Sequence, residues 1–81
     1  VGPRAARFFQ EADAALQRKL VRGIEHLKAD PRRHPQIKPL KGPLAGYWRL
    51  RAGDYRILYC IDDKHQTVYV DKIAHRREVY E

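Results

Sequence analysis

The sequence contains no methionine, only one cysteine (Cys60) and no long run of apolar residues. A single cysteine excludes a disulfide within the chain and offers no metal-ligand pattern, which is typical of a reducing compartment such as the cytoplasm. No apolar run approaches the roughly 18 residues of a membrane span, and the first residues lack the apolar segment of a signal peptide. Because the chain begins Val1-Gly2-Pro3 without a methionine, we expect it to be trimmed at its start.

Acidic residues are in the minority, with 10 Asp and Glu against 17 Lys and Arg, which gives a net charge of +7. Such a charge favours a polyanionic partner, although it says nothing about the fold. With 81 residues, of which 43% are hydrophobic, the chain can build one small core. We therefore predict a single domain that spans residues 1–81.

The first thirty residues follow the helical period. Pro3 suits the first turn of a helix that runs to about Glu11, and Asp13 is a typical N-cap for a second helix. Asp30-Pro31 ends that helix, because the residue before a proline disfavours helical geometry. Its apolar residues recur at three- and four-residue steps: Leu16, Leu20, Ile24 and Leu27. The sequence predicts a helical hairpin whose apolar stripe must be buried against another part of the chain.

The rest of the chain changes character twice. Residues 31–46 are dense in proline and glycine and are predicted as an irregular basic loop. From Tyr47 the period becomes two, which predicts antiparallel strands near 47–52, 55–61 and 67–73. The predicted fold class is therefore α+β, with the helical hairpin on one face of an antiparallel sheet of about three strands.

The turn between the first two strands sets which side chains face each other. With Ala52-Gly53 as a two-residue loop, Arg49 lies opposite Arg56. Alternation then divides the sheet into an apolar face for the helices to cover and a second, basic face. The apolar face comprises Trp48, Leu50, Tyr55, Ile57, Tyr59, Ile61, Val68 and Val70, and the basic face carries Tyr47, Arg49, Arg51 and Arg56.

Two opposed arginines repel each other, at a cost within roughly 0.2–1 kcal/mol for cross-strand pairs. The pair either splays into water or binds an anion, and a phosphate suits it because guanidinium groups bind phosphate bidentately. In the second case, removing Arg56 should leave the stability of the free protein nearly unchanged. The last strand returns beside the hairpin and should bring basic and aromatic side chains to the pair: His75, Arg76, Arg77 and Tyr80.

Two segments, LKGPLAGYWRLRAGDYRILYCIDD (40–63) and VYVDKIAHRREVY (68–80), resemble the signature segments of the RelE/ParE superfamily of toxins from type II toxin–antitoxin systems. The resemblance implies a microbial RNase-like fold and a cognate antitoxin from an adjacent gene. For RelE-type members it implies cleavage of messenger RNA in the ribosomal A site. The family's first strand, which precedes the segment seen here as Gly2-Pro3-Arg4-Ala5, is missing from this sequence.

The resemblance also implies residue roles. Arg56 matches the arginine that RelE-type members use on the scissile phosphate, and Arg49 matches a basic position on the preceding strand. Tyr80 matches the C-terminal tyrosine and Arg76 an arginine shortly before it. Tyr47 stands where some members carry a lysine proposed to act in proton transfer, so the identity of the general base stays open.

Attack by an RNA 2′-hydroxyl on the adjacent phosphorus needs a base, cations and an acid, but no metal or other cofactor. His75 is our candidate for general acid or base, because histidine is the side chain type most often used for proton transfer at neutral pH. Residues expected to hold phosphates of messenger or ribosomal RNA are Lys38, Lys41, Tyr47, Arg51 and Arg77. The helix residues Arg18, Lys19 and Arg22 are interpreted as charges that confer solubility.

Three function classes follow from these patterns. The first is a ribosome-dependent messenger RNA endonuclease that inhibits translation, and the second is a ParE-like poison of DNA gyrase without ribonuclease activity. The third is a basic RNA-binding module with no catalysis. Arg49 and Arg56, together with the HRREVY tail, favour the RelE-like endonuclease, for which we expect no membrane association and a toxin–antitoxin hetero-oligomer.

Overall fold

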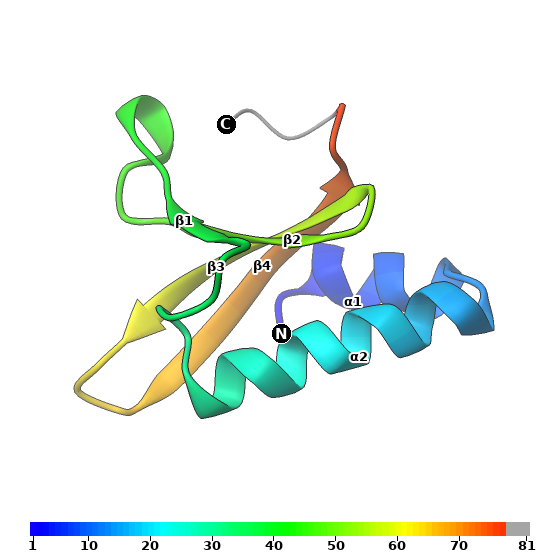
Figure 1. Ribbon diagram of the computed structural model, residues 1–81, viewed down its shortest axis with the longest axis horizontal. Coiled ribbons are helices and arrows are strands. Elements are labelled where there is room, and N and C mark those ends of the chain that lie inside the picture. The colour runs from blue at the N-terminus through cyan, green and yellow to red at the C-terminus, as the bar shows by residue number, and fades with distance from the viewer. Residues whose placement is uncertain (78–81) are drawn as a thin grey trace.

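The computed structural model describes residues 1–77, in which two helices pack on one face of a four-stranded antiparallel sheet (Figure 1). The strand order is β1-β2-β3-β4. The helices are α1 (Pro3–Glu11) and α2 (Ala14–Ala29), and a 3-10 helix, η1, covers Gly42–Leu44. The strands are β1 (Ile37–Pro39), β2 (Trp48–Ala52), β3 (Tyr55–Asp62) and β4 (Thr67–His75). The predicted α+β class is confirmed.

The helices begin and end where the sequence predicts. Asp13 caps α2, and its carboxylate Oδ1 accepts a hydrogen bond of 2.8 Å from the Leu16 backbone N–H. Leu20 and Leu27 of the predicted stripe are buried in the core, α1 lies against β4, and α2 crosses β2 and β4. Neither helix of the described part is both long and apolar enough to cross a membrane.

The segment predicted as an irregular loop, residues 31–46, is more ordered than expected. It contains β1, which pairs with β2 through Ile37↔Leu50 and Lys38↔Arg49, and the short helix η1. Proline is tolerated here because β1 is an edge strand, where a missing N–H breaks no ladder on the outer side. The sheet therefore has one strand more than the three predicted, because the proline content of residues 31–46 favoured a loop over the edge strand β1.

The predicted register of the β2–β3 hairpin was wrong. The two loop residues are Gly53 and Asp54, and Ala52 pairs with Tyr55. Gly53 has a φ of +61°, which fits the first loop position of a type II′ turn, and glycine adopts this angle without strain. Because the shift amounts to two residues, the side chains of β2 and β3 stay on the faces predicted for them.

Tyr59 is the largest fully buried side chain, and it ties the sheet to the end of α2. It is 0% exposed, and its hydroxyl donates a hydrogen bond of 2.6 Å to the Pro31 carbonyl. Burial raises the pKa of the Tyr59 phenol above its ordinary value of 10.0. A buried phenol in this position favours the neutral form in the folded state.

Tyr59→Phe is expected to lower the free energy of unfolding by about 1–2 kcal/mol at pH 7, because the Pro31 carbonyl loses its donor. The raised pKa adds a pH dependence: the stability tied to the neutral phenol is fully present below pH 10 and is lost above it, as the unfolded phenol ionises first. The difference in the free energy of unfolding between the wild type and Tyr59→Phe should therefore become smaller above about pH 10.

Denaturant unfolding at pH 7 and at high pH checks this prediction. Tyr69→Phe is the matched control, because Tyr69 is 46% exposed and should change stability little. Equal unfolding midpoints for Tyr59→Phe and wild type at pH 7 would show that the hydrogen bond to Pro31 contributes nothing.

Candidate functional site

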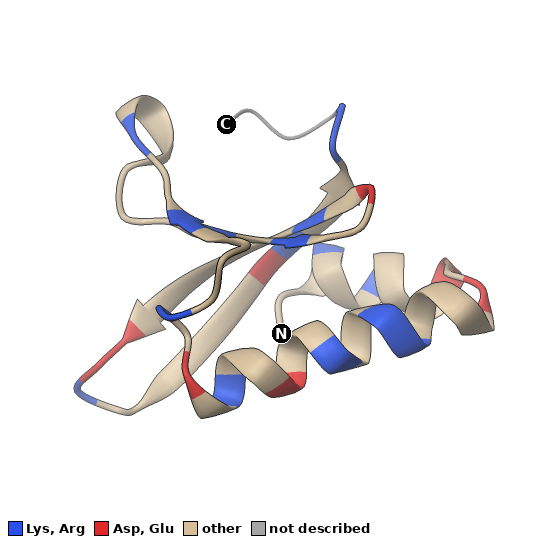
Figure 2. Cartoon of the chain, viewed as in Figure 1, with Lys and Arg blue, Asp and Glu red and all other residues tan. Residues whose placement is uncertain are grey.

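Basic side chains gather on the sheet face that the helices leave uncovered. Register places Lys38 opposite Arg49, and Arg51 opposite Arg56, on this face. The backbone N–H of Arg76, the first residue beyond β4, donates a hydrogen bond of 2.8 Å to the Asp54 carbonyl, which brings Arg76 beside the β2–β3 turn that Arg56 contacts. We call Lys38, Arg49, Arg51, Arg56 and Arg76 the arginine face. Figure 2 shows Lys and Arg along β1 and β2 and at the end of β4.

Arg56 is a buried residue in the middle of this face, with only 4% of its surface exposed. Its Nη1 donates hydrogen bonds of 3.2 Å to the Gly53 carbonyl and 3.1 Å to the Tyr55 carbonyl. These contacts hold the guanidinium against the β2–β3 turn. Because the side chain binds the backbone of its own hairpin, we now expect removal of Arg56 to lower the stability of the free protein, in place of the unchanged stability predicted from the sequence.

Arg49 and Arg56 do not lie directly opposite each other, which corrects the predicted pair. The partners of Arg49 are Leu58 on β3 and Lys38 on β1, and the partner of Arg56 on β2 is the exposed Arg51. Arg49 is half-buried, and its Nη1 donates a hydrogen bond of 2.8 Å to the Gln36 carbonyl. Arg49 stands diagonal to Arg56, a relation in which Cα atoms are about 7–8 Å apart and long side chains still reach each other.

His75 does not meet the arginines, contrary to prediction. It pairs with Tyr55, and the two rings make an edge contact at 5.5 Å, while Tyr55 makes a second edge contact at 5.6 Å with Phe8 of α1. Because neighbouring residues of a strand point to opposite faces, Ala74 lies across from Arg56 and His75 lies on the helix side. The structure thus gives His75 a packing contact where the sequence predicted proton transfer.

The remaining predicted residues are spread around the arginine face. Arg77 is exposed just beyond β4, and its backbone N–H donates a hydrogen bond of 3.3 Å to Nδ1 of His75. Lys41 is exposed at the start of η1 rather than in the sheet. Tyr80 lies outside the described residues, so its predicted role stays a prediction.

An apolar cluster on the arginine face is a feature that the sequence reasoning missed. Leu40, Leu58 and Ala74 are buried together there, with Leu44 and Tyr47 packed against them. The alternation of β3 contained the signal, because Leu58 falls on the same face as Arg56. The cluster forms where η1 rises over the sheet (Figure 1), and apolar and basic side chains lie side by side on this face, because Leu58 pairs with Arg49 and Ala74 with Arg56.

Tyr47 carries the hydroxyl nearest in sequence to the arginines of β2. The charge of the neighbouring Cys60 thiolate, followed by that of Asp71, raises the pKa of the Tyr47 phenol. Burial raises the pKa of the Cys60 thiol, against a hydrogen bond from Tyr47 that lowers it. Tyr47 thus holds its proton near neutral pH and is suited to donate a proton or a hydrogen bond. Within residues 1–77, no three His, Cys, Asp or Glu side chains are placed to bind a metal ion together.

Comparisons with known sequences point to one family. A model of the ParE toxin of type II toxin–antitoxin systems matches residues 2–80. Toxin RelG of Mycobacterium tuberculosis is 49% identical over 43 residues, which cover 53% of this chain and 49% of RelG. Toxin RelE of the same organism is 46% identical over 47 residues, or 58% of this chain and 48% of RelE. The chain spans about half the length of these curated relatives.

Solved structures agree with the sequence matches. A chain of the toxin–antitoxin complex RelBE2 from Mycobacterium tuberculosis is 33% identical, with a TM-score of 0.78 and coverage of 91% of this chain and 90% of that one. The YoeB/ParE toxin from Agrobacterium tumefaciens is 30% identical, with a TM-score of 0.74 and coverage of 85% and 83%. An archaeal RelE–RelB complex from Pyrococcus horikoshii, 22% identical with a TM-score of 0.78 over 95% and 91%, shares the fold. This chain therefore belongs to the RelE/ParE superfamily of toxins from type II toxin–antitoxin systems.

Proposed function

We propose that the chain is a RelE-like toxin that cleaves messenger RNA on the ribosome, without a metal, and so inhibits translation in the cytoplasm. The observation that carries this proposal is the arginine face. Three arginines from two neighbouring strands share one sheet face, with Lys38 and Arg76 beside them. Guanidinium groups gathered on one face suit a phosphate, because each can bind it through two parallel hydrogen bonds.

In the proposed reaction, the RNA 2′-oxygen attacks the adjacent phosphorus and the bond to the 5′-oxygen of the next nucleotide breaks. The 2′-hydroxyl proton passes to a base, and the departing 5′-oxygen takes a proton from an acid, which leaves a 2′,3′-cyclic phosphate. Arg56 and Arg49 stabilise the negative charge on the pentacoordinate phosphorus. The hydrogen bonds of Arg56 to the Gly53 and Tyr55 carbonyls orient its guanidinium before substrate arrives.

The other residues of the site fall into supporting roles in this proposal. Lys38, Arg51 and Arg76 bind phosphates that flank the scissile one, and Lys41 and Arg77 bind ribosomal or messenger RNA further out. Tyr47 donates to the phosphate or to the leaving oxygen, because its raised pKa keeps the phenol protonated. Tyr80 is proposed for the same region on the family resemblance alone. The helix-side position of His75 argues against its use as general acid or base.

Primer extension on cellular messenger RNA after induction of the toxin tests the proposal. We expect new cuts within translated reading frames and none when translation initiation is blocked. Arg49→Gln should weaken these cuts, whereas the exposed helix residue Arg18 offers a matched control, Arg18→Gln. Growth inhibition with trapped gyrase–DNA complexes and no RNA cuts would favour a ParE-like poison, and RNA binding without cuts would favour a binding module.

We also propose a cognate antitoxin, encoded by an adjacent gene, that covers the arginine face. The face combines five basic residues with the apolar cluster of Leu40, Leu58 and Ala74, a pairing that suits an acidic amphipathic segment. The solved relative RelBE2 is itself a toxin–antitoxin complex.

Co-expression with the product of the neighbouring gene is expected to yield a tight complex that no longer cleaves RNA. Lys38→Glu combined with Arg51→Glu should weaken that complex by about tenfold or more, because like charges then oppose each other across the interface. Titration of purified toxin with labelled antitoxin measures the effect. A complex of unchanged affinity in the double variant would place the antitoxin elsewhere.

A further inference from the structure

A second basic site lies on the helix side of the sheet, in a pocket of about 240 Å³ between α2 and β2. We call it the α2–β2 pocket. Five of its eight lining residues carry a cationic or imidazole side chain, and none is acidic. The lining residues are Lys19, Arg22, Gly23, His26, His34, Leu50, Arg51 and Ala52.

The helix contributes its cations to this pocket as one stripe. Lys19, Arg22 and His26 follow one another at steps of three and four residues, so they share a face of α2, where the like charges of Lys19 and Arg22 repel each other. Lys19 also reaches the β2–β3 turn, since its Nζ lies 3.2 Å from where a Cβ on Gly53 would stand. The ion pairs found within residues 1–77 involve neither Lys19, Arg22 nor Arg51.

The two imidazoles are held in place by backbone groups. Their rings meet edge to face at 4.6 Å, and Nε2 of His26 donates a hydrogen bond of 3.1 Å to the Arg33 carbonyl. Nδ1 of His34 accepts a hydrogen bond of 3.0 Å from the Gln36 N–H, so the proton of a neutral His34 ring resides on Nε2. His34 therefore offers a fixed N–H donor beside the cations of α2.

We propose that the α2–β2 pocket binds a backbone phosphodiester of the same RNA strand that the arginine face holds. Arg51 connects the two sites, because it lies opposite Arg56 on the arginine face and also lines the pocket. An RNA strand on the arginine face can thus continue over the edge of β2 to Lys19, Arg22 and His34. This inference rests on the proposed function, and it gives Lys19 and Arg22 a role beyond the solubility predicted from sequence.

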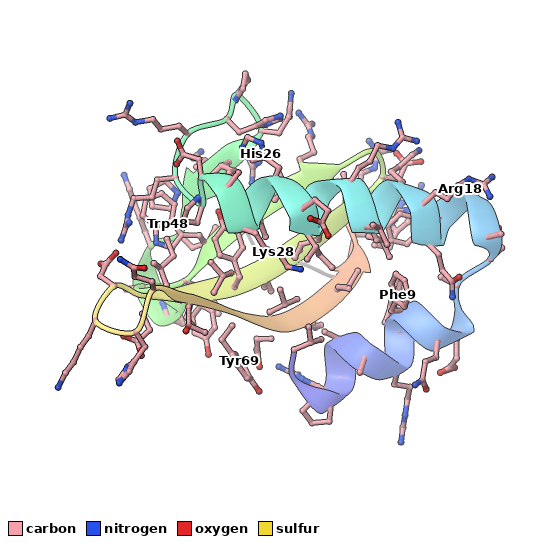
Figure 3. All side chains as sticks on the ribbon, turned by 90° about the horizontal axis from the view of Figure 1, so that it is seen from below. Phe9, Arg18, His26, Lys28, Trp48 and Tyr69 are labelled. Carbon is pink, nitrogen blue, oxygen red and sulfur yellow. The ribbon has the colours of Figure 1, made fainter. Side chains whose placement is uncertain are left out.

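The test compares two double variants that remove the same charge from the same helix. Lys19→Gln/Arg22→Gln removes the pocket cations, and Arg18→Gln/Lys28→Gln removes two that lie outside the pocket lining. Figure 3 shows Arg18 near the start of α2, and His26 and Lys28 on opposite edges of it. Binding of the full chain to a short single-stranded RNA, with a 2′-deoxy sugar at the cleavage position, is measured over a range of salt.

We expect the pocket variant to bind this RNA roughly fivefold or more weakly, with a salt slope smaller by about one, while the control variant changes less. Inorganic phosphate, added to the wild type and to the control variant, should shift the imidazole NMR signals of His26 and His34. The same addition to the pocket variant should leave those signals unmoved.

Equal RNA affinities and salt slopes for the two double variants would overturn the inference. So would imidazole NMR signals of the wild type that do not shift when phosphate is added. A pocket variant that loses only antitoxin binding would overturn it too, because the pocket would then contact a protein. If the wild type cleaves RNA while both variants bind alike, the proposed function stands and the inference fails. If the wild type does not cleave RNA, and only the pocket variant shows weaker binding of RNA and phosphate, the proposed phosphate site is supported and the proposed reaction fails.

Discussion

Arg56→Gln is expected to lower ribosome-dependent RNA cleavage by about 10²–10³-fold and the free energy of unfolding by about 1–3 kcal/mol. The first effect follows if the guanidinium stabilises charge on the reacting phosphate. The second follows from the folded protein itself, because Arg56 is 4% exposed and donates to the Gly53 and Tyr55 carbonyls. Cleavage rates on programmed ribosomes and denaturant midpoints of the same preparations measure both effects.

Two further variants separate the catalytic effect from the structural one. Arg56→Lys keeps the charge but loses the planar fork, so its cleavage should also fall well below that of the wild type. Arg51→Gln removes the exposed like charge opposite Arg56, and should leave stability unchanged or raise it by up to about 0.5 kcal/mol. If the Arg56→Gln protein is folded and cleaves RNA at the rate of the wild type, Arg56 does not stabilise charge on the reacting phosphate.

Leu20→Ala is expected to lower the free energy of unfolding by about 2–5 kcal/mol, the range for a buried leucine that leaves a cavity. Leu20 is 0% exposed and belongs to the core cluster that joins α2 to Ile57 and Tyr59 of β3. Domains of this size are stable by only about 5–15 kcal/mol, so this loss is a large share of the total. Denaturant unfolding followed by circular dichroism measures it.

The neighbouring residue provides the control for this variant. Val21 is on the same helix but 43% exposed, so Val21→Ala should change stability by about 0.5 kcal/mol or less. Equal losses for the two variants would mean that the side chain of Leu20 contributes no more to the core than a surface residue does. Cleavage by Leu20→Ala should decline with its folded fraction, since Leu20 belongs to the core on the helix side of the sheet, away from the arginine face.

The sequence by itself determined the helices and the two faces of the sheet. Asp13 caps α2 and Asp30 follows its end, because capping and the block before proline act over a few residues. Trp48, Leu50, Ile57 and Tyr59 face the helices as predicted, since alternation along a strand depends only on the local backbone. The family resemblance followed from the same hairpin and tail segments.

Only the tertiary structure decided which side chains meet. The turn at Gly53–Asp54 made Arg51 the partner of Arg56, because φ at Gly53 selects the loop and a two-residue shift leaves the hydrophobic pattern unchanged. The β3–β4 register paired His75 with Tyr55, whose ring also contacts Phe8, and so placed His75 on the helix side of the sheet. Two further features depend on contacts between elements far apart in the chain: the burial of Arg56, and the pocket lined by Lys19, Arg22, His34 and Arg51. Local sequence patterns do not predict such contacts.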